Sequence, residues 1–150
     1  MRVGYDIVFC TAGRGDGVSV QKLQASETVC ALQDMTGGFW MKKPVIAVVF
    51  HSVCANTYLM AREYRDALRH MGAEVVFYRL HDPGYAATAD AFPASREYKS
   101  EILSVEELKT PAQVLDCDAL FLGSPTYFGN VSAPVKAFID SLVDYWVEAR

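Results

Sequence analysis

The sequence lacks the features of several large classes of protein. Its longest apolar run, residues 45–50, is far too short to cross a lipid bilayer. The net charge of −4, from 14 basic and 18 acidic residues, comes without the clustered Lys and Arg of a nucleic-acid or anionic-membrane surface. We therefore expect no nucleic-acid partner and no membrane insertion.

Cysteine is scarce and dispersed. The four cysteines, Cys10, Cys30, Cys54 and Cys117, form no Cys-x-x-Cys pair and have no His at zinc-finger spacing. The start of the chain has only a four-residue apolar stretch, residues 7–10, which does not make a secretory signal. These absences predict a reduced protein of the cytoplasm, without a metal site.

Strand and helix patterns alternate over residues 45–146. Residues 45–50 form a continuous β-branched and aromatic run, which is typical of a strand covered on both faces. Residues 74–80 and 119–122 predict two further strands. Helices are expected from about Thr57 to a glycine cap at Gly72, from Pro111 to about Asp116, and from a cap at Ser132 along an apolar stripe to Trp146. This alternation predicts an α/β fold with a parallel sheet.

Two other segments have no sustained period. Residues 81–104 are rich in Ala, Pro, Asp, Gly and Ser, and we expect a long irregular connection there. Residues 1–40 are treated as an N-terminal extension that precedes a domain of residues 41–150. The extension is either an appended leader or the source of an extra strand at residues 4–10. Its Gly-x-Gly-x-Gly lacks the full spacing of a dinucleotide-binding turn.

The first candidate site follows the strand at residues 45–50. Ligands of open parallel sheets bind beyond the carboxyl ends of the strands. Residues 52–57 offer two hydroxyls, an amide and the N–H groups of a helix N-terminus, which can bind a phosphate monoester without Lys or Arg. The same residue types also cap ordinary helices, so the segment by itself supports both interpretations.

The second candidate site, residues 123–130, follows the strand at residues 119–122. Two aromatics, Tyr127 and Phe128, lie there between Pro125 and Gly129. They suit a planar apolar ligand whose polar atoms bond to nearby backbone groups, or alternatively they pack onto the adjacent helix. Together the two segments describe one ligand with a phosphate end and an aromatic end.

Residues 45–146 resemble the flavodoxin-like superfamily, and within it the Trp-repressor-binding-protein type of FMN-dependent NAD(P)H:quinone oxidoreductase. The resemblance rests on Gly-Ser-Pro-Thr-Tyr-Phe-Gly-Asn-Val-Ser at residues 123–132, followed in register by Phe138, Asp140 and Trp146. Residues 52–57 match the phosphate loop of the family less well. The resemblance implies a three-layer sandwich around a parallel sheet, with FMN as cofactor, NADH or NADPH as electron donor and a quinone as acceptor.

The resemblance also implies roles for individual residues. Around the FMN phosphate it places Ser52, Val53, Cys54, Ala55, Asn56 and Thr57. Along the ribityl chain and isoalloxazine ring it places Thr126, Tyr127 and Phe128, in a loop shaped by Pro125, Gly129 and Asn130. Trp146 falls beside the substrate pocket, or ends the apolar stripe of its helix, or both. No catalytic side chain is expected because the flavin carries the redox chemistry, and His51 is either structural or influences proton delivery.

The sequence departs from the family pattern in three places. Ala55 replaces a Gly, and Ala is strained if that position needs a positive φ. Cys54 replaces an aromatic that meets the nicotinamide. The chain stops at Arg150, so we expect the two C-terminal strands and the third flavin loop of the family to be missing and FMN to bind weakly. The edge of the strand at residues 119–122 is then open unless another chain or residues 4–10 cover it, and we expect a homo-oligomer.

Other enzyme and signalling classes do not fit. A low-molecular-weight phosphatase needs Arg six positions after its Cys, but Met60 follows Cys54 at that spacing and Asp16 follows Cys10. A response-regulator receiver needs acidic residues for Mg²⁺ where the first strand is followed by His51 and Ser52. The remaining alternative is a flavodoxin-like electron carrier that binds FMN but docks protein partners instead of quinones.

Overall fold

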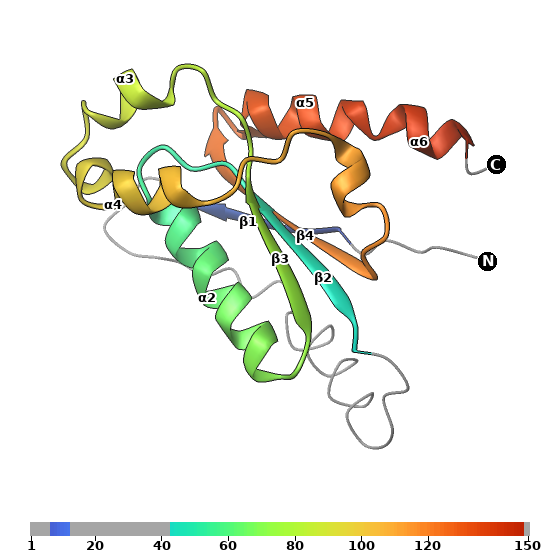
Figure 1. The fold of residues 1–150 in the computed structure, drawn as a ribbon. Coiled ribbons are helices and arrows are strands. Elements are labelled where there is room, and N and C mark those ends of the chain that lie inside the picture. The colour runs from blue at the N-terminus through green and yellow to red at the C-terminus, as the bar shows by residue number, and fades with distance from the viewer. Residues whose placement is uncertain (1–6, 13–42, 149–150) are drawn as a thin grey trace.

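The computed structural model describes residues 7–12 and 43–148, drawn in colour in Figure 1. Its sheet has the strand order β1-β4-β2-β3, all parallel, with β5 paired antiparallel to β4. The strands are β1 (Ile7–Ala12), β2 (Val45–Phe50), β3 (Glu74–Arg79), β4 (Ala119–Tyr127) and β5 (Asn130–Val131). The helices are α2 (Asn56–His70), α3 (Tyr85–Ala89), α4 (Pro93–Ser104), the 3₁₀ helix η1 (Pro111–Val114), α5 (Ala133–Ser141) and α6 (Val143–Glu148).

Successive residues of β2 face opposite layers of the molecule. Ile46, Val48 and Phe50 pack into the core beneath α2, α3 and α4. Ala47 and Val49 pack into a second core that includes residues of α5. Each of these side chains is at most 2% exposed, so the predicted strand with two covered faces is confirmed. The result is the three-layer, flavodoxin-like α/β arrangement of Figure 1, with α2 on one side of the sheet and α5 on the other.

Helix α2 ends where the sequence predicts. Gly72 has a φ of 92°, and its N–H donates to the carbonyl of Arg69 over 3.0 Å. A glycine in the left-handed region just after the last turn is the usual way to satisfy the final carbonyls of a helix. The predicted glycine cap is therefore confirmed.

Three predicted elements differ in the structure. Residues 81–104 contain two helices, α3 and α4, rather than an irregular connection. Proline favours the first turn of a helix, so Pro93 begins α4 instead of breaking it. The predicted helix from Ser132 to Trp146 divides at Leu142 into α5 and α6. The strand predicted at residues 119–122 continues to Tyr127, because its later residues pair with β1 and β5.

Strand β1 lies along β4, parallel to it, from Ile7 beside Leu120 to Ala12 beside Pro125. A strand is therefore present in the N-terminal extension, as one of the two alternatives proposed, although it spans Ile7–Ala12 rather than residues 4–10. It covers the edge of β4 that we expected to be open. The rest of the extension lies outside the described residues.

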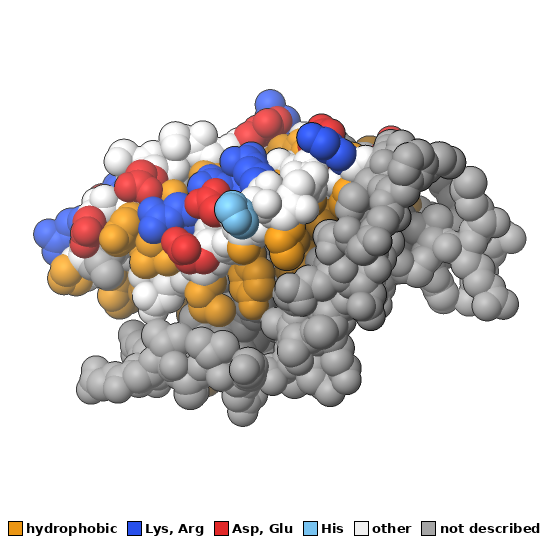
Figure 2. Space-filling model, turned by 90° about the horizontal axis from the view of Figure 1, so that it is seen from below, with side chains coloured by type: hydrophobic (Ala, Val, Ile, Leu, Met, Phe, Trp, Pro, Cys, Tyr) orange, Lys and Arg blue, Asp and Glu red, His pale blue; other side chains and the backbone are white. Residues whose placement is uncertain are grey.

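The described surface carries no large region of one charge on the face seen in Figure 2, where acidic and basic side chains are interspersed. Arg62 lies 3.5 Å from Glu101, and Arg65 lies 2.8 Å from Asp66. No helix in the described part of the chain is both long and apolar enough to span a bilayer.

Candidate functional site

The two candidate segments leave neighbouring strands at the carboxyl edge of the sheet. Phe50 of β2 pairs with Gly123 of β4, and the N–H of His51 donates to the carbonyl of Gly123 over 3.0 Å. A Cβ atom at Gly123 would lie only 3.0 Å from Thr57 Cγ2 and 3.1 Å from Phe50 Cβ. This glycine thus lets the start of α2 approach β4 closely, and the two segments meet.

The first segment is a tight turn from β2 into α2. Ser52, Val53, Ala55 and Thr57 are buried, Cys54 is half-buried and Asn56 is exposed. Ala55 has a φ of 64°, in the left-handed region that costs an L-residue roughly 1–2 kcal/mol. The position therefore does need a positive φ, which is the condition under which we expected Ala to be strained.

The start of α2 lacks a side-chain cap. Its N-cap is Ala55, which has no acceptor atom in its side chain, and Asn56 and Thr57 already belong to the helix. The ordinary-cap interpretation of this segment is therefore wrong. The first N–H groups of an α-helix have no acceptor within the helix, so they are available to a ligand at this end of α2.

Ser52 adds a hydroxyl to the same turn. Its Oγ is buried and has no hydrogen-bond partner among the described residues. A buried polar atom without a partner costs roughly 1–3 kcal/mol, so its presence calls for an explanation. An anion bound at the start of α2 supplies one, because its oxygens accept from both hydroxyl and N–H donors.

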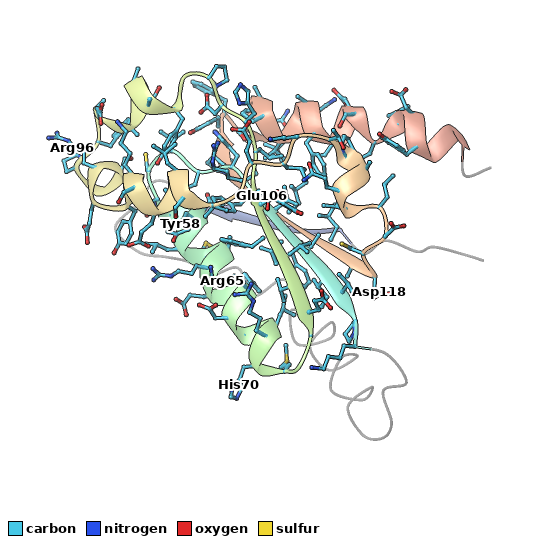
Figure 3. The ribbon with its side chains drawn as sticks, viewed as in Figure 1. Tyr58, Arg65, His70, Arg96, Glu106 and Asp118 are labelled. Atoms are coloured by element: carbon cyan, nitrogen blue, oxygen red, sulfur yellow. The ribbon has the colours of Figure 1, made fainter. Side chains whose placement is uncertain are left out.

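Helix α4 supports this end of α2. The hydroxyl of Tyr58 donates to Glu101 Oε2 over 2.9 Å, and Tyr58 lies between the two helices in Figure 3. Burial, and then the hydrogen bond to Glu101, raise the pKa of the Tyr58 phenol. Tyr58 is therefore a neutral donor that ties the first turns of α2 to α4.

The second segment is a hairpin rather than an open loop. Thr126 pairs with Val131 and Tyr127 with Asn130, which leaves Phe128 and Gly129 as a two-residue turn. Both turn residues have positive φ, 51° and 78°, as type I′ hairpin turns require. We call residues 125–131 the aromatic hairpin.

The aromatic side chains of this hairpin are exposed to different degrees. Phe128 is 109% exposed relative to its reference state and Tyr127 is 45% exposed. The alternative in which both aromatics pack onto the adjacent helix is therefore wrong for Phe128. A fully exposed Phe on left-handed backbone gains nothing from burial in this chain, which favours a role in contacting a ligand.

Two buried serines close the base of the aromatic hairpin. The N–H of Ser132 donates to Ser124 Oγ over 3.0 Å, and the Ser124 hydroxyl donates to the carbonyl of Pro125 over 2.9 Å. Ser132 is the N-cap residue of α5, as predicted, but its side chain makes no capping bond. Its Oγ instead lies 2.9 Å from Nδ1 of His51.

His51 connects the base of the hairpin to the loop after β3. It is 4% exposed, and its Nε2 lies 3.0 Å from Asp82 Oδ2. The order Asp82–His51–Ser132 has the connectivity of a hydrolase triad, but Ser132 is only 1% exposed and no substrate reaches its hydroxyl. Both ring nitrogens of His51 have protein partners, which favours the structural interpretation of this residue over proton delivery.

Sequence reasoning missed Asp82, and it missed the bonds that Ser124 and Ser132 make at the base of the hairpin. The sequence did contain a signal for them: Asp82 follows β3 and Ser124 lies in β4, so both lie at the carboxyl edge of the sheet, where ligands bind. Trp146 lies in α6, but its side chain is outside those that the structure describes. Among the described residues no group of three or more His, Cys, Asp or Glu is placed to hold a metal ion.

Neither Cys54 nor Cys117 forms a disulfide. Cys54 in the first segment is a half-buried free thiol, and Cys117 is a buried one before β4. Burial raises the pKa of the Cys117 thiol, and the neighbouring carboxylates add to this effect. Cys117 is therefore a protonated core residue and not a nucleophile.

The location of the two segments agrees with the ligand geometry of flavodoxin-like sheets. In the order 2-1-3-4-5, FMN binds where the chain switches direction between the first and third strands. Here β2 and β4 hold those positions, since β3 lies beyond β2 on one side and β1 beyond β4 on the other. The candidate site thus lies at the switch point.

Comparisons with known proteins match this region. Residues 36–149 match the model of the family described as NADPH-dependent FMN reductase. A relative named NAD(P)H dehydrogenase (quinone) from Archaeoglobus fulgidus is 36% identical over 105 residues, covering 70% of this chain and 54% of the relative. A protein of the same name from Deinococcus radiodurans is 33% identical over 113 residues, covering 73% and 55%. The chain spans about half the length of the curated relatives it matches.

The family match extends over the whole candidate site, from the turn that follows β2 to the aromatic hairpin and α5. The strand order and the position of the site at the switch point agree with it. On these grounds the chain belongs to the NADPH-dependent FMN reductase family.

Proposed function

We propose that this chain binds FMN at the carboxyl edge of β2 and β4 and takes part in electron transfer from NADH or NADPH to a quinone. The observation that carries the proposal is the buried, unpartnered Ser52 Oγ beside an uncapped helix start, next to a hairpin with an exposed Phe128. The first feature suits a phosphate and the second an aromatic ring system. One FMN molecule has both.

The phosphate end of the ligand is assigned to residues 52–57. Hydroxyl and N–H donors can hold a phosphate monoester through dipoles alone, which suits a segment without Lys or Arg. The left-handed Ala55 turns the backbone into the first turn of α2. The residues in this part of the proposal are Ser52, Val53, Cys54, Ala55, Asn56 and Thr57.

The aromatic end is assigned to the hairpin. Thr126, Tyr127 and Phe128 would contact the ribityl chain and the isoalloxazine ring, in a turn shaped by Pro125, Gly129 and Asn130. Covering a face of the ring excludes water from it and aligns it for a donor or acceptor on the other face. Trp146 is proposed as a contact of the substrate beside the flavin.

The redox chemistry itself belongs to the cofactor, which accepts hydride from a nicotinamide and passes two electrons to an acceptor when bound. The residues of this chain bind and orient it. None of them is needed as a nucleophile. A quinone acceptor is supported by the printed names of the relatives, and the cytoplasm is the compartment that suits the free thiols Cys54 and Cys117.

Titration of the apoprotein with FMN and with FAD tests the cofactor assignment. FMN is expected to bind more tightly, because the turn offers one phosphate-sized site; tighter binding of FAD would contradict it. Ser52→Ala should weaken FMN binding and leave the affinity for riboflavin, which has no phosphate, unchanged. A steady-state assay with NADH or NADPH and benzoquinone then separates a reductase from an electron carrier that serves protein partners.

A further inference from the structure

The aromatic hairpin has an exposed tip and a buried base. Residues 127–130 are all exposed, and the hairpin pairs with itself through only two residue pairs. A two-stranded ribbon of this length is not stable alone in water. The position of the hairpin is therefore determined at its base, where Ser124 and Ser132 are buried.

A chain of buried and half-buried polar groups runs across that base from three strand ends. Asp82 follows β3, His51 follows β2, and Ser132 begins α5 after the β4–β5 hairpin. The contacts are 3.0 Å from Asp82 Oδ2 to His51 Nε2 and 2.9 Å from His51 Nδ1 to Ser132 Oγ. The backbone N–H of His51 also donates to the carbonyl of Gly123, so this residue is attached to β4 as well.

The hydrogen bonds of this chain have one consistent direction. A carboxylate only accepts, so Nε2 of His51 carries the proton and donates it to Asp82. In that tautomer Nδ1 carries no proton and accepts from the hydroxyl of Ser132. Ser132 in turn donates its N–H to Ser124, whose hydroxyl donates to Pro125 at the first residue of the hairpin. Each donor in this series has an acceptor.

We propose that His51 is a positioning residue for the aromatic hairpin: oriented by Asp82, it accepts from Ser132 and so holds Tyr127 and Phe128 in the place where they contact the flavin. The contact with the flavin rests on the proposed function, whereas the ordering of the hairpin does not. Residues behind a binding group, which hydrogen-bond to its supporting backbone, keep that group in one geometry.

Two substitutions at His51 separate its two bonds. His51→Asn places an amide oxygen near the position of Nδ1 and retains an acceptor for Ser132. His51→Gln reaches the position of Nε2 and retains only a donor for Asp82. Ser132→Ala removes the hydroxyl that donates to His51 and so breaks the same bond from its other partner. His81→Gln is the matched control, since His81 is exposed and pairs with Glu107, which takes no part in the chain from Asp82 to Ser132.

Amide hydrogen exchange of the apoprotein measures the ordering of the hairpin directly. We expect the amides of residues 126–131 to exchange about tenfold faster in His51→Gln and in Ser132→Ala, with near-native rates in His51→Asn and His81→Gln. The amides of α2 serve as the internal reference for global stability. Equal acceleration in α2 and the hairpin, or equal rates for the Asn and Gln variants, would overturn the proposal.

The same variants then test the consequence for the flavin. In FMN titrations His51→Gln and Ser132→Ala should raise the Kd by about fivefold and reduce the visible circular dichroism of the flavin, while His51→Asn stays near native. An unchanged Kd and spectrum in all four variants would refute the flavin part of the proposal. Failure of the unaltered protein to bind FMN would refute the proposed function, and the exchange experiment would still decide whether His51 orders the hairpin.

Discussion

At Ala55 a buried methyl group sits on left-handed backbone, with a φ of 64° and 1% exposure. Ala55→Val should lower the free energy of unfolding by about 2 kcal/mol or more, because a β-branched side chain is least tolerated there. Ala55→Gly should change it by less than about 1 kcal/mol, since relief of strain offsets the lost methyl burial and the extra chain entropy. Urea unfolding measures both, and equal losses for Val and Gly would show that packing, not backbone strain, dominates at this position.

The aromatic residues of the hairpin are expected to matter for binding and not for stability. The double substitution of Tyr127 and Phe128 by Ala should leave the free energy of unfolding within about 0.5 kcal/mol of native, because Phe128 is fully exposed. FMN affinity should fall markedly in titrations of the same variant. Phe138→Ala is the contrast, because Phe138 is buried in the core and its truncation should cost about 3–5 kcal/mol. Global unfolding of the double variant by circular dichroism would mean that the hairpin aromatics are part of the core.

At the scale of elements, an acidic side chain joins β3 to the segment after α4. Arg79 lies 2.6 Å from Glu107, and the backbone of Arg79 bonds to residues on both sides of Glu107. The hydrogen bond from His81, followed by Arg79, lowers the pKa of the Glu107 carboxyl. A carboxyl whose pKa is lowered by folding stabilises the native state at pH values above its unfolded pKa, about 4.3. This contribution is lost as the pH falls through the pKa of the folded state.

Glu107→Gln should therefore reduce stability at pH 7 by a small amount, as expected for a partly exposed pair. The difference from the unaltered protein should disappear at an acid pH below the folded pKa of Glu107, where the carboxyl is protonated in both states. Urea unfolding at the two pH values checks this. A difference that persists undiminished at acid pH would show that the Gln side chain, and not the loss of charge, causes the effect.

The pairing of β1 with β4 predicts which proline substitutions in β1 destabilise the protein. Successive N–H groups of a strand point to opposite sides, so only one of Val8 and Phe9 donates toward β4. We expect one of Val8→Pro and Phe9→Pro to destabilise the protein and the other, on the outer side of the strand, to be tolerated. Thermal unfolding compares them. Two equally harmless prolines would show that β1 contributes no pairing to the sheet in solution.

For the whole molecule, we expect self-association. Strand β1 covers the edge of β4, yet large apolar side chains remain exposed elsewhere, among them Leu103 at 46% and Val143 at 53%. Exposed apolar surface of this kind favours contacts between copies. Light scattering over a range of protein concentrations should give a mass above that of the monomer. A monomer at every concentration would contradict the expected homo-oligomer.

Much of the fold follows from local patterns in the sequence. The β-branched run of residues 45–50 can be buried on both faces only in a covered sheet, and Gly72 can end α2 because its own backbone tolerates a φ of 92°. The convergence of residues 52–57 and 123–130 was likewise predictable, because parallel strands end at one edge of the sheet. Neither inference needs contacts with distant parts of the chain beyond the sheet itself.

The sequence by itself determined the α/β class, the strand covered on both faces and the two segments of the candidate site, since periodicity and turn chemistry are properties of a few neighbouring residues. Only the tertiary structure decided that β4 extends to Tyr127, that β1 lies beside it, and that His51 joins Ser132 across a separation of 81 residues. Those features depend on which distant groups meet when the layers pack. A histidine at a strand end can bond to many different groups, and the packing of the layers determines that His51 meets Ser132 and Asp82.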